Sequence, residues 1–204
     1  MLDNANARRS AARFIDPVAR LMLRLKVTPD GITWFGCGAT IFISVVFLAQ
    51  GNFLIGAILF GAFGLIDLLD GTMARMLGTA GPWGAFLDST LDRISDAAVI
   101  CALIYFYVNA DGDNSQLAVI AGIVSLVMSL MTSYARAKAE SLDAKCTVGI
   151  AERAERNLLI WVALLISALV TDVMPYALAA LAILSTVTVI QRILFVRKQL
   201  VIKA

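Results

Sequence analysis

The dominant pattern along the chain is a series of long apolar segments separated by short polar turns. A helix needs roughly 20 apolar residues to cross about 30 Å of hydrocarbon, and six segments of the chain reach this length. Connections rich in Gly, Pro, Asn and Asp lie between them. The pattern therefore predicts an all-α integral membrane protein with six transmembrane helices. Their approximate ranges are residues 32–50, 53–76, 83–109, 116–138, 157–172 and 175–197.

The segment before the first predicted span has a different pattern, in which basic and apolar residues alternate at near-helical spacing. This pattern predicts an amphipathic helix that lies in the membrane interface against anionic headgroups, with a solvated juxtamembrane arm as the alternative. Pro17 predicts a local break or the start of a new helical turn. We therefore divide the chain into an N-terminal juxtamembrane amphipathic segment, residues 1–30, and a six-helix membrane domain, residues 31–204.

The composition supports a membrane protein and limits the chemistry that it can perform. Hydrophobic residues make up 60% of the 204 residues, charged residues only 16%, and the mean hydropathy is +0.84. These values are too apolar for a soluble domain. Histidine is absent, and the three cysteines are too far apart for a disulfide framework or a zinc site. Any acid–base or metal chemistry must therefore use carboxylates.

The distribution of positive charge indicates how the chain is oriented. In the six-span arrangement, all 17 Lys and Arg residues lie on the side shared by both termini and by the loops after spans two and four. The opposite side carries only Asp111, Asp113 and Asp172. Because Lys and Arg stay on the cytoplasmic side, we expect a multi-pass protein of the plasma membrane with both termini in the cytoplasm. The N-terminal residues lack the features of a removed signal peptide.

Four aspartates lie at regular spacing near the cytoplasmic ends of the second and third predicted spans. Asp67 and Asp70 are three residues apart, and Asp88 and Asp92 are four apart, so each pair occupies one helical face. The short connection makes the two helices antiparallel neighbours, so the faces can meet. An acidic side chain within a span costs about 2.5 to 3.5 kcal/mol, and four cost roughly 10 kcal/mol. Some favourable interaction must offset this cost.

A bound divalent cation is the interpretation that we favour for these aspartates. Ion pairs with Arg75 and Arg93, or a water-filled vestibule, are the alternatives, but two arginines cannot neutralise five aspartates once Asp96 is included. Oxygen ligands without His or Cys indicate Mg²⁺, Mn²⁺ or Ca²⁺. Gly71 and Gly84 would let a ligand approach the carboxylates, although close helix packing explains them equally well. Carboxylates, a metal and an arginine facing lipid predict a site for a phosphorylated lipid.

The same residues form a longer motif. The sequence contains DxxDGxxAR, then eight residues, then GxxxDxxxD, and by this motif it resembles the CDP-alcohol phosphatidyltransferase family. The motif residues are Asp67, Asp70, Gly71, Ala74, Arg75, Gly84, Asp88 and Asp92. The resemblance implies that Asp67, Asp70 and Asp88 bind Mg²⁺ or Mn²⁺, with two ions expected. It implies that Asp92 either completes the two-metal site or acts as the catalytic base for the attacking hydroxyl.

The resemblance also implies a nucleotide pocket. CDP-diacylglycerol would be the donor substrate, CMP would leave, and Gly71, Ala74 and Arg75 would line the pocket. In the family the element that corresponds to Thr28, Pro29 and the following Asp lies close to the cytidine. Considered alone, this element is a good helix start, with Thr as the cap and Pro in the first turn.

The acceptor alcohol is indicated by basic residues in the second cytoplasmic loop and at the end of the last span. These basic residues are more numerous than one diphosphate needs, which predicts an acceptor that carries its own phosphate. For Arg192 the alternative is a side chain that snorkels to the membrane interface. Within the family, the stretches SYARAKAE, GIAERAERN and IQRILFVR are most similar to actinobacterial phosphatidylinositol phosphate synthases. This resemblance implies inositol 1-phosphate as the acceptor and a homodimer. The residues that would bind the acceptor phosphate are Ser133, Arg136, Arg153, Arg156 and Arg192.

Two other functions are considered. A phosphatidylglycerophosphate synthase, which uses glycerol 3-phosphate, shares the eight-position motif. A divalent-cation transporter would also place carboxylates in spans, but it predicts charges at mid-membrane on several helices and usually a repeat. For Asp96 we expect an ion pair with Arg93 rather than contact with sugar hydroxyls. Membrane lipids are expected as further partners, and nucleic acid is not.

Overall fold

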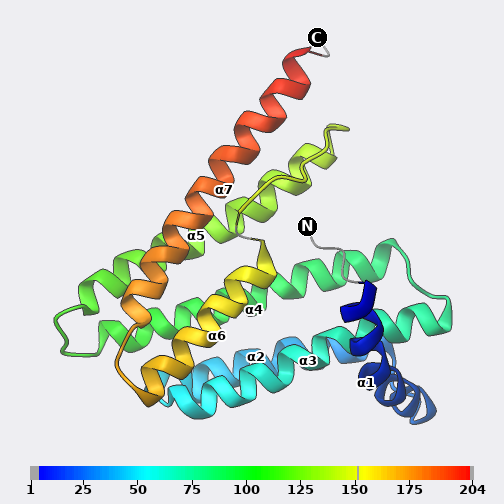
Figure 1. Cartoon of the computed structure of the whole chain (residues 1–204), viewed down its shortest axis with the longest axis horizontal. Coiled ribbons are helices and arrows are strands. Elements are labelled where there is room, and N and C mark those ends of the chain that lie inside the picture. The colour runs from blue at the N-terminus through cyan, green and yellow to red at the C-terminus, as the bar shows by residue number, and fades with distance from the viewer. Residues whose placement is uncertain (1–4, 151, 203–204) are drawn as a thin grey trace. The chain divides into compact units, whose positions relative to one another are not determined.

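The computed structural model describes residues 5–150 and 152–202, with side chains for residues 15–64, 69–150 and 152–201 (Figure 1). Within these ranges the chain is all helical and contains no strand, as predicted. The boundaries follow the predicted segments closely. The elements are α1 Ala5–Arg24, α2 Pro29–Val46, the 3₁₀ turn η1 Leu48–Gln50, α3 Phe53–Leu77, α4 Pro82–Val108, α5 Ser115–Glu140, α6 Arg153–Leu169 and α7 Met174–Ile202.

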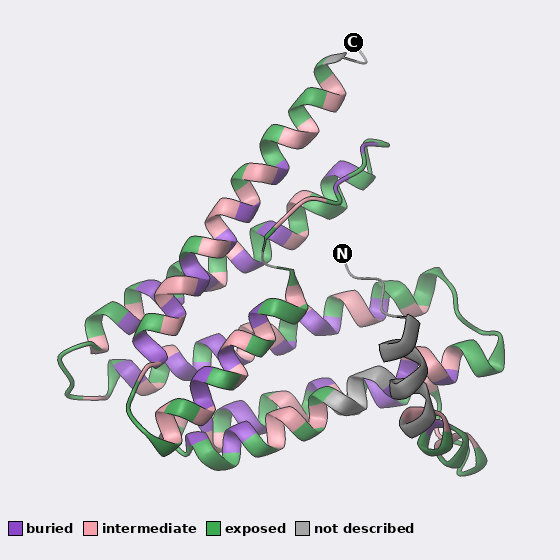
Figure 2. Cartoon of the chain, viewed as in Figure 1, coloured by how far each residue is buried: buried purple, intermediate pink, exposed green. Residues whose placement is uncertain are grey.

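Four helices of the described chain are long and apolar enough to cross a membrane. They are α2 with η1, α3, α5 and α7. Helix α4 carries four charged residues between positions 88 and 96, and α6 has only 17 residues. Large apolar side chains such as Trp34, Phe42 and Ile58 are about 60% exposed, as expected for surfaces that face lipid (Figure 2). The helices fit a multi-pass membrane protein, and the count of six spans stays a prediction.

The predicted break at Pro17 is wrong, because α1 continues through this residue as one helix. A proline within a helix removes one hydrogen bond, and packing of the apolar face can offset the loss. Here Ala19 is completely buried in a cluster with Ile32, Leu69 and Met73. Helix α1 is therefore held by contacts with α2 and α3, which a local reading of Pro17 cannot reveal.

The chain divides into two compact units, which are described separately. The first contains Met1–Ile43 and Ile58–Ser95, and the second contains Ser44–Ala57 and Asp96–Ala204. In the first unit, Gly78 ends α3 with a positive φ of 67°, and the amide of Thr79 donates to the carbonyl of Ala74. This helix end places the short connection from α3 to α4 beside the acidic residues of the motif.

In the second unit, α5 and α7 pack against each other and run in the same direction (Figure 1). The Ser125 hydroxyl donates to the Leu178 carbonyl at 2.9 Å, and seven residues further along α5 the carbonyl of Thr132 accepts from Arg192. Helix α6 also packs on α7. Small and hydroxyl side chains at the α5 interface allow this close approach.

Candidate functional site

A cavity of about 680 Å³ in the first unit brings most of the motif residues together. It lies between the starts of α2 and α4 and the end of α3. Thr28 and Pro29, which were predicted to be near a nucleotide, lie on the same cavity as the motif residues of α3 and α4. The predicted residues that line it are Thr28, Pro29, Asp70, Gly71, Ala74, Arg75, Gly84 and Asp88.

Asp70 is held in place by hydrogen bonds from two directions. Its side chain is buried, the Thr33 hydroxyl donates to its Oδ2 at 2.7 Å, and the amide of Gly71 donates to its Oδ1. Thr33 also lines the cavity. The sequence reasoning missed Thr33, although a hydroxyl one turn after Pro29 in an apolar span was a possible signal. Such partners fix the orientation of a carboxylate before a ligand arrives.

The two motif glycines leave open space at the cavity. A Cβ at Gly84 would have no described atom within 4 Å, and one at Gly71 would only touch the end of the Arg75 side chain at 3.4 Å. Close helix packing within the described residues therefore does not explain either glycine, and the open space beside them leaves room for a ligand. The Arg75 guanidinium is exposed and donates to the Thr72 hydroxyl at 3.0 Å.

Trp83 and Asp30, which both line the cavity, are joined by a hydrogen bond. The indole nitrogen of Trp83 donates to Asp30 Oδ2 at 2.9 Å and thereby ties the first turn of α4 to the first turn of α2. Thr28 caps α2, because its Oγ1 accepts from the Gly31 amide at 3.1 Å. The helix-start interpretation of this element is thus confirmed, and the same residues also line the cavity.

The four predicted metal ligands are described to different extents. Asp70 and Asp88 line the cavity, whereas the Asp67 side chain lies outside the described residues. Asp92 is buried, and Oδ2 lies 3.8 Å from Arg93 Nη1. Among the described side chains, no three His, Cys, Asp or Glu residues converge as a metal centre. Asp70 and Asp88 on one cavity fit an oxygen-preferring divalent cation, and the complete ligand set stays a prediction.

In the second unit, Asp96 pairs with the basic residues at the start of α6. Its Oδ1 lies 3.5 Å from Arg153 Nε, and its Oδ2 lies 3.6 Å from Arg156 Nη2. The expected pair with Arg93 is wrong, since the ion pair of Arg93 is with Asp92. A single carboxylate thus holds two of the five residues predicted to bind an acceptor phosphate.

The remaining three basic-region residues have different surroundings. Ser133 is half-buried on α5, and Arg136 is exposed and pairs with Glu140 at 2.9 Å. Arg192 is only 4% exposed and donates from Nε to the Val148 carbonyl at 2.9 Å and from Nη1 to the Thr132 carbonyl. Arg192 therefore lies inside the second unit rather than snorkelling to a surface.

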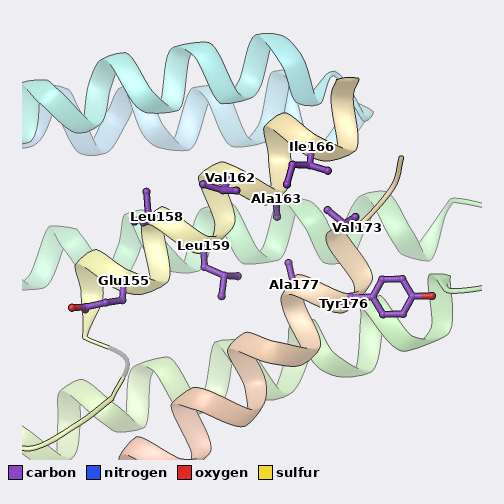
Figure 3. Close-up of a pocket in the computed structure, with 9 residues that line it drawn as sticks. All are labelled: Glu155, Leu158, Leu159, Val162, Ala163, Ile166, Val173, Tyr176 and Ala177. Atoms are coloured by element: carbon purple, nitrogen blue, oxygen red, sulfur yellow. The ribbon is translucent and has the colours of Figure 1, made fainter. Parts of the chain in front are cut away.

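A separate groove of about 540 Å³ lies between α6 and α7 (Figure 3). Its floor is apolar, with Leu159, Ala163 and Ala177 among its lining residues, and Glu155 and Tyr176 lie at its two ends. The groove suits hydrocarbon and has no set of groups that could perform catalysis.

The apolar helices, and a cavity lined by carboxylates, glycines and an arginine, fit a membrane protein with a site for a phosphorylated ligand. Residues 26–191 match the CDP-alcohol phosphatidyltransferase family. The chain belongs to this family, as the motif predicted.

Three relatives illustrate the similarity. The chain is 39% identical to the phosphatidylinositol phosphate synthase of Cutibacterium acnes, over 92% of this chain and 94% of that protein. It is 41% identical to the archaetidylinositol phosphate synthase of Methanothermobacter thermautotrophicus, over 92% and 91%. The crystal structure of the phosphatidylinositol phosphate synthase of Mycobacterium tuberculosis with CDP-DAG bound has a TM-score of 0.85 at 35% identity, covering 91% of this chain and 94% of that chain. A structure of the same enzyme with manganese and citrate has a TM-score of 0.83 at 34% identity, covering 88% and 87%.

Proposed function

We propose that this protein transfers the phosphatidyl group of CDP-diacylglycerol to inositol 1-phosphate, forming phosphatidylinositol phosphate and releasing CMP. The observation that carries the proposal is the single cavity that collects Thr28, Pro29 and the motif residues of α3 and α4. It is supported by the relatives that are named inositol phosphate synthases and by the crystal structure of one of them with CDP-DAG.

On the donor side, the cavity would bind the diphosphate and the cytidine. Asp70 and Asp88, with Asp67, would hold a divalent cation, Mg²⁺ or Mn²⁺, as the manganese-containing structure of a relative supports. When bound, the cation would neutralise charge on the diphosphate, and two ions are expected. Gly71 and Gly84 would leave room for the phosphates, and Arg75 would bind one of them through its planar guanidinium.

In the reaction, a hydroxyl oxygen of the acceptor attacks the phosphorus that carries the diacylglycerol. A new oxygen–phosphorus bond forms, the bond to the bridging oxygen breaks, and CMP leaves with that oxygen. Asp92 would either accept the hydroxyl proton or serve as a further metal ligand. Thr33 would keep the Asp70 carboxylate oriented throughout.

On the acceptor side, five residues of the second unit would bind the phosphate of inositol 1-phosphate. Arg153 and Arg156 are already ordered by Asp96, and Arg192 by two carbonyls. Guanidinium groups with fixed orientation bind a phosphate with a smaller entropic cost. Ser133 and Arg136 would complete the set from α5.

The remaining predictions about the molecule form part of the proposal. The protein would cross the plasma membrane six times, with α1 in the cytoplasmic interface and both termini and the site facing the cytoplasm. The asymmetry of Lys and Arg supports this arrangement. We also propose that residues 1–30 form a juxtamembrane segment and residues 31–204 form the membrane domain. The protein would assemble as a homodimer.

The decisive experiment supplies purified enzyme with CDP-diacylglycerol and one of four acceptors: inositol 1-phosphate, glycerol 3-phosphate, free inositol or serine. Identification of the lipid product by mass spectrometry should give phosphatidylinositol phosphate only, and EDTA should abolish it until Mg²⁺ or Mn²⁺ is restored. A phosphatidylglycerophosphate product would replace the proposed acceptor with glycerol 3-phosphate. Failure to release CMP with any acceptor would remove the transferase function.

A further inference from the structure

After α5 ends, residues 144–149 form an extended segment, here called the strap, which runs back before α6 begins (Figure 1). Extended backbone outside a sheet lacks regular partners, so its amides and carbonyls must be satisfied by side chains or water. In this unit, side chains of α7 supply several of those partners. The strap is therefore an ordered part of the second unit and not simply a linker.

Gln199 makes the most specific of these contacts. Its Oε1 accepts from the Lys145 amide at 3.0 Å, and its Nε2 donates to the Lys145 carbonyl at 2.7 Å. One side-chain amide thus pairs with both backbone groups of a single residue, as a neighbouring β-strand would. This pairing sets the register of the strap along α7.

Burial and close backbone approach support the same placement. Cys146 is 1% exposed and lies in a cluster with Ala139 and Ala144, against which Val196 and Leu200 pack. At the other end of the strap, Gly149 has a φ of 151°, and a Cβ there would lie 2.7 Å from Thr188 Cγ2. A residue with a side chain rarely adopts this φ and would also clash with Thr188, so glycine is required for the strap to lie on α7.

The strap also contacts a residue of the proposed acceptor site. Arg192 Nε donates to the Val148 carbonyl, and its Nη1 donates to the Thr132 carbonyl at α5. The orientation of this buried guanidinium therefore depends on the docked position of Val148. Displacement of the strap would remove one of the two carbonyls that orient it.

We propose that Gln199 is a positioning residue for the acceptor site, because its amide holds the strap on α7 and the docked strap orients the Arg192 guanidinium. This inference rests on the proposed function, which assigns Arg192 to the acceptor phosphate. Gln199 itself touches no substrate. Its loss should weaken acceptor binding and leave the donor side unchanged.

The first measurement follows docking of the strap without using catalysis. In a full-length Cys37→Ala, Cys101→Ala background reconstituted in lipid nanodiscs, Cys146 is the sole thiol, and its reaction rate with a water-soluble maleimide reports how often the strap leaves α7. Gln199→Ala should raise this rate at least tenfold. Gln191→Ala removes an amide from the same helix at a position with no described hydrogen bond to the strap, so it should leave the rate within twofold.

The second measurement compares steady-state constants in the unmodified cysteine background. Gln199→Ala should raise the apparent KM for inositol 1-phosphate about tenfold, equivalent to about 1.4 kcal/mol, while kcat and the KM for CDP-diacylglycerol stay within twofold. Gln199→Glu retains the acceptor for the Lys145 amide but places a second acceptor against the Lys145 carbonyl. It should therefore also raise the labelling rate and the KM for inositol 1-phosphate, and it provides a second test if the alanine variant folds poorly.

Several outcomes would overturn the inference. An unchanged Cys146 labelling rate in Gln199→Ala would show that the amide does not hold the strap, and equal acceleration in Gln191→Ala would show that the effect is not specific. Faster labelling with an unchanged acceptor KM would remove the positioning role, and an equal rise in both KM values would indicate general damage. If the unmodified enzyme does not turn over inositol 1-phosphate, the proposed function fails and the positioning role fails with it. The labelling rates would then still report the docking of the strap by itself.

Discussion

The substitution Gly84→Ala separates the function of the cavity from the stability of the fold. Gly84 is the third residue of α4 and lines the cavity, and a Cβ there would have no described atom within 4 Å. Alanine is favoured over glycine by about 0.8 to 1.0 kcal/mol in a helix interior, and by less at this position in the first turn. The substitution should therefore leave stability unchanged or raise it slightly.

The added methyl group should nevertheless impair the binding of the donor substrate. It would occupy space that the diphosphate needs, and forcing an extra methyl into a filled site costs about 1 to 3 kcal/mol. This cost corresponds to a rise of roughly 5- to 150-fold in the KM for CDP-diacylglycerol. The KM for the acceptor should change little, because the methyl group would lie in the cavity that is proposed to bind the donor.

The assay combines the apparent KM for CDP-diacylglycerol, the affinity for CMP from calorimetry, and the midpoint of thermal unfolding. Gly38→Ala is the matched control, since a Cβ there also has no described atom within 4 Å and Gly38 does not line the cavity. Gly122→Ala is the opposite control, because its Cβ would lie 2.6 Å from Ile104 Cγ1 and should lower stability without a selective effect on KM. If Gly84→Ala and Gly38→Ala bind CMP and CDP-diacylglycerol equally well, the nucleotide does not occupy this cavity.

Substitutions at three further residues test individual contacts. Thr33→Val removes the hydrogen bond to Asp70 and should weaken Mn²⁺ binding about 10- to 100-fold, as measured by electron paramagnetic resonance. Thr33→Ser keeps the hydroxyl and should bind Mn²⁺ as the unmodified protein does. Equal affinity in the unmodified protein and both variants would contradict an orienting role for Thr33. Asp92→Asn should abolish turnover and leave CMP binding largely intact, so a parallel loss of both would count against its assigned role. Asp96→Asn removes the carboxylate that pairs with the buried Arg156 guanidinium and should lower the free energy of unfolding by about 1 to 3 kcal/mol. Unchanged thermal unfolding of that variant would show that the ion pair contributes little.

The helices could be predicted because their signals are local. The apolar segments have the length of a membrane span, and the Gly, Pro and Asn residues between them mark where the helices end. The boundaries of α3, α4 and α5 consequently differ from the predicted spans by no more than a few residues. Pro17 was misjudged because its local signal is opposed by packing of α1 on α2 and α3.

The acidic site was partly predictable for a related reason. Spacings of three and four residues place Asp70 with Gly71 and Asp88 with Gly84 on defined helix faces, and the short connection between α3 and α4 brings those faces together. Thr33 was missed because it lies 37 residues from Asp70 in the chain. No periodicity connects residues on separate helices, so only the packing of α2 could reveal that contact.

The sequence by itself determined the membrane class, the approximate helix boundaries, the family and the motif residues that line the cavity, because each depends on short-range spacing and on composition. Only the tertiary structure decided that Asp96 pairs with Arg153 and Arg156, and that Gln199 holds Lys145 across 54 residues. A charged or amide side chain can satisfy its hydrogen bonds with many partners of similar strength. Which partner it takes is set by the long-range packing that brings one of them within reach.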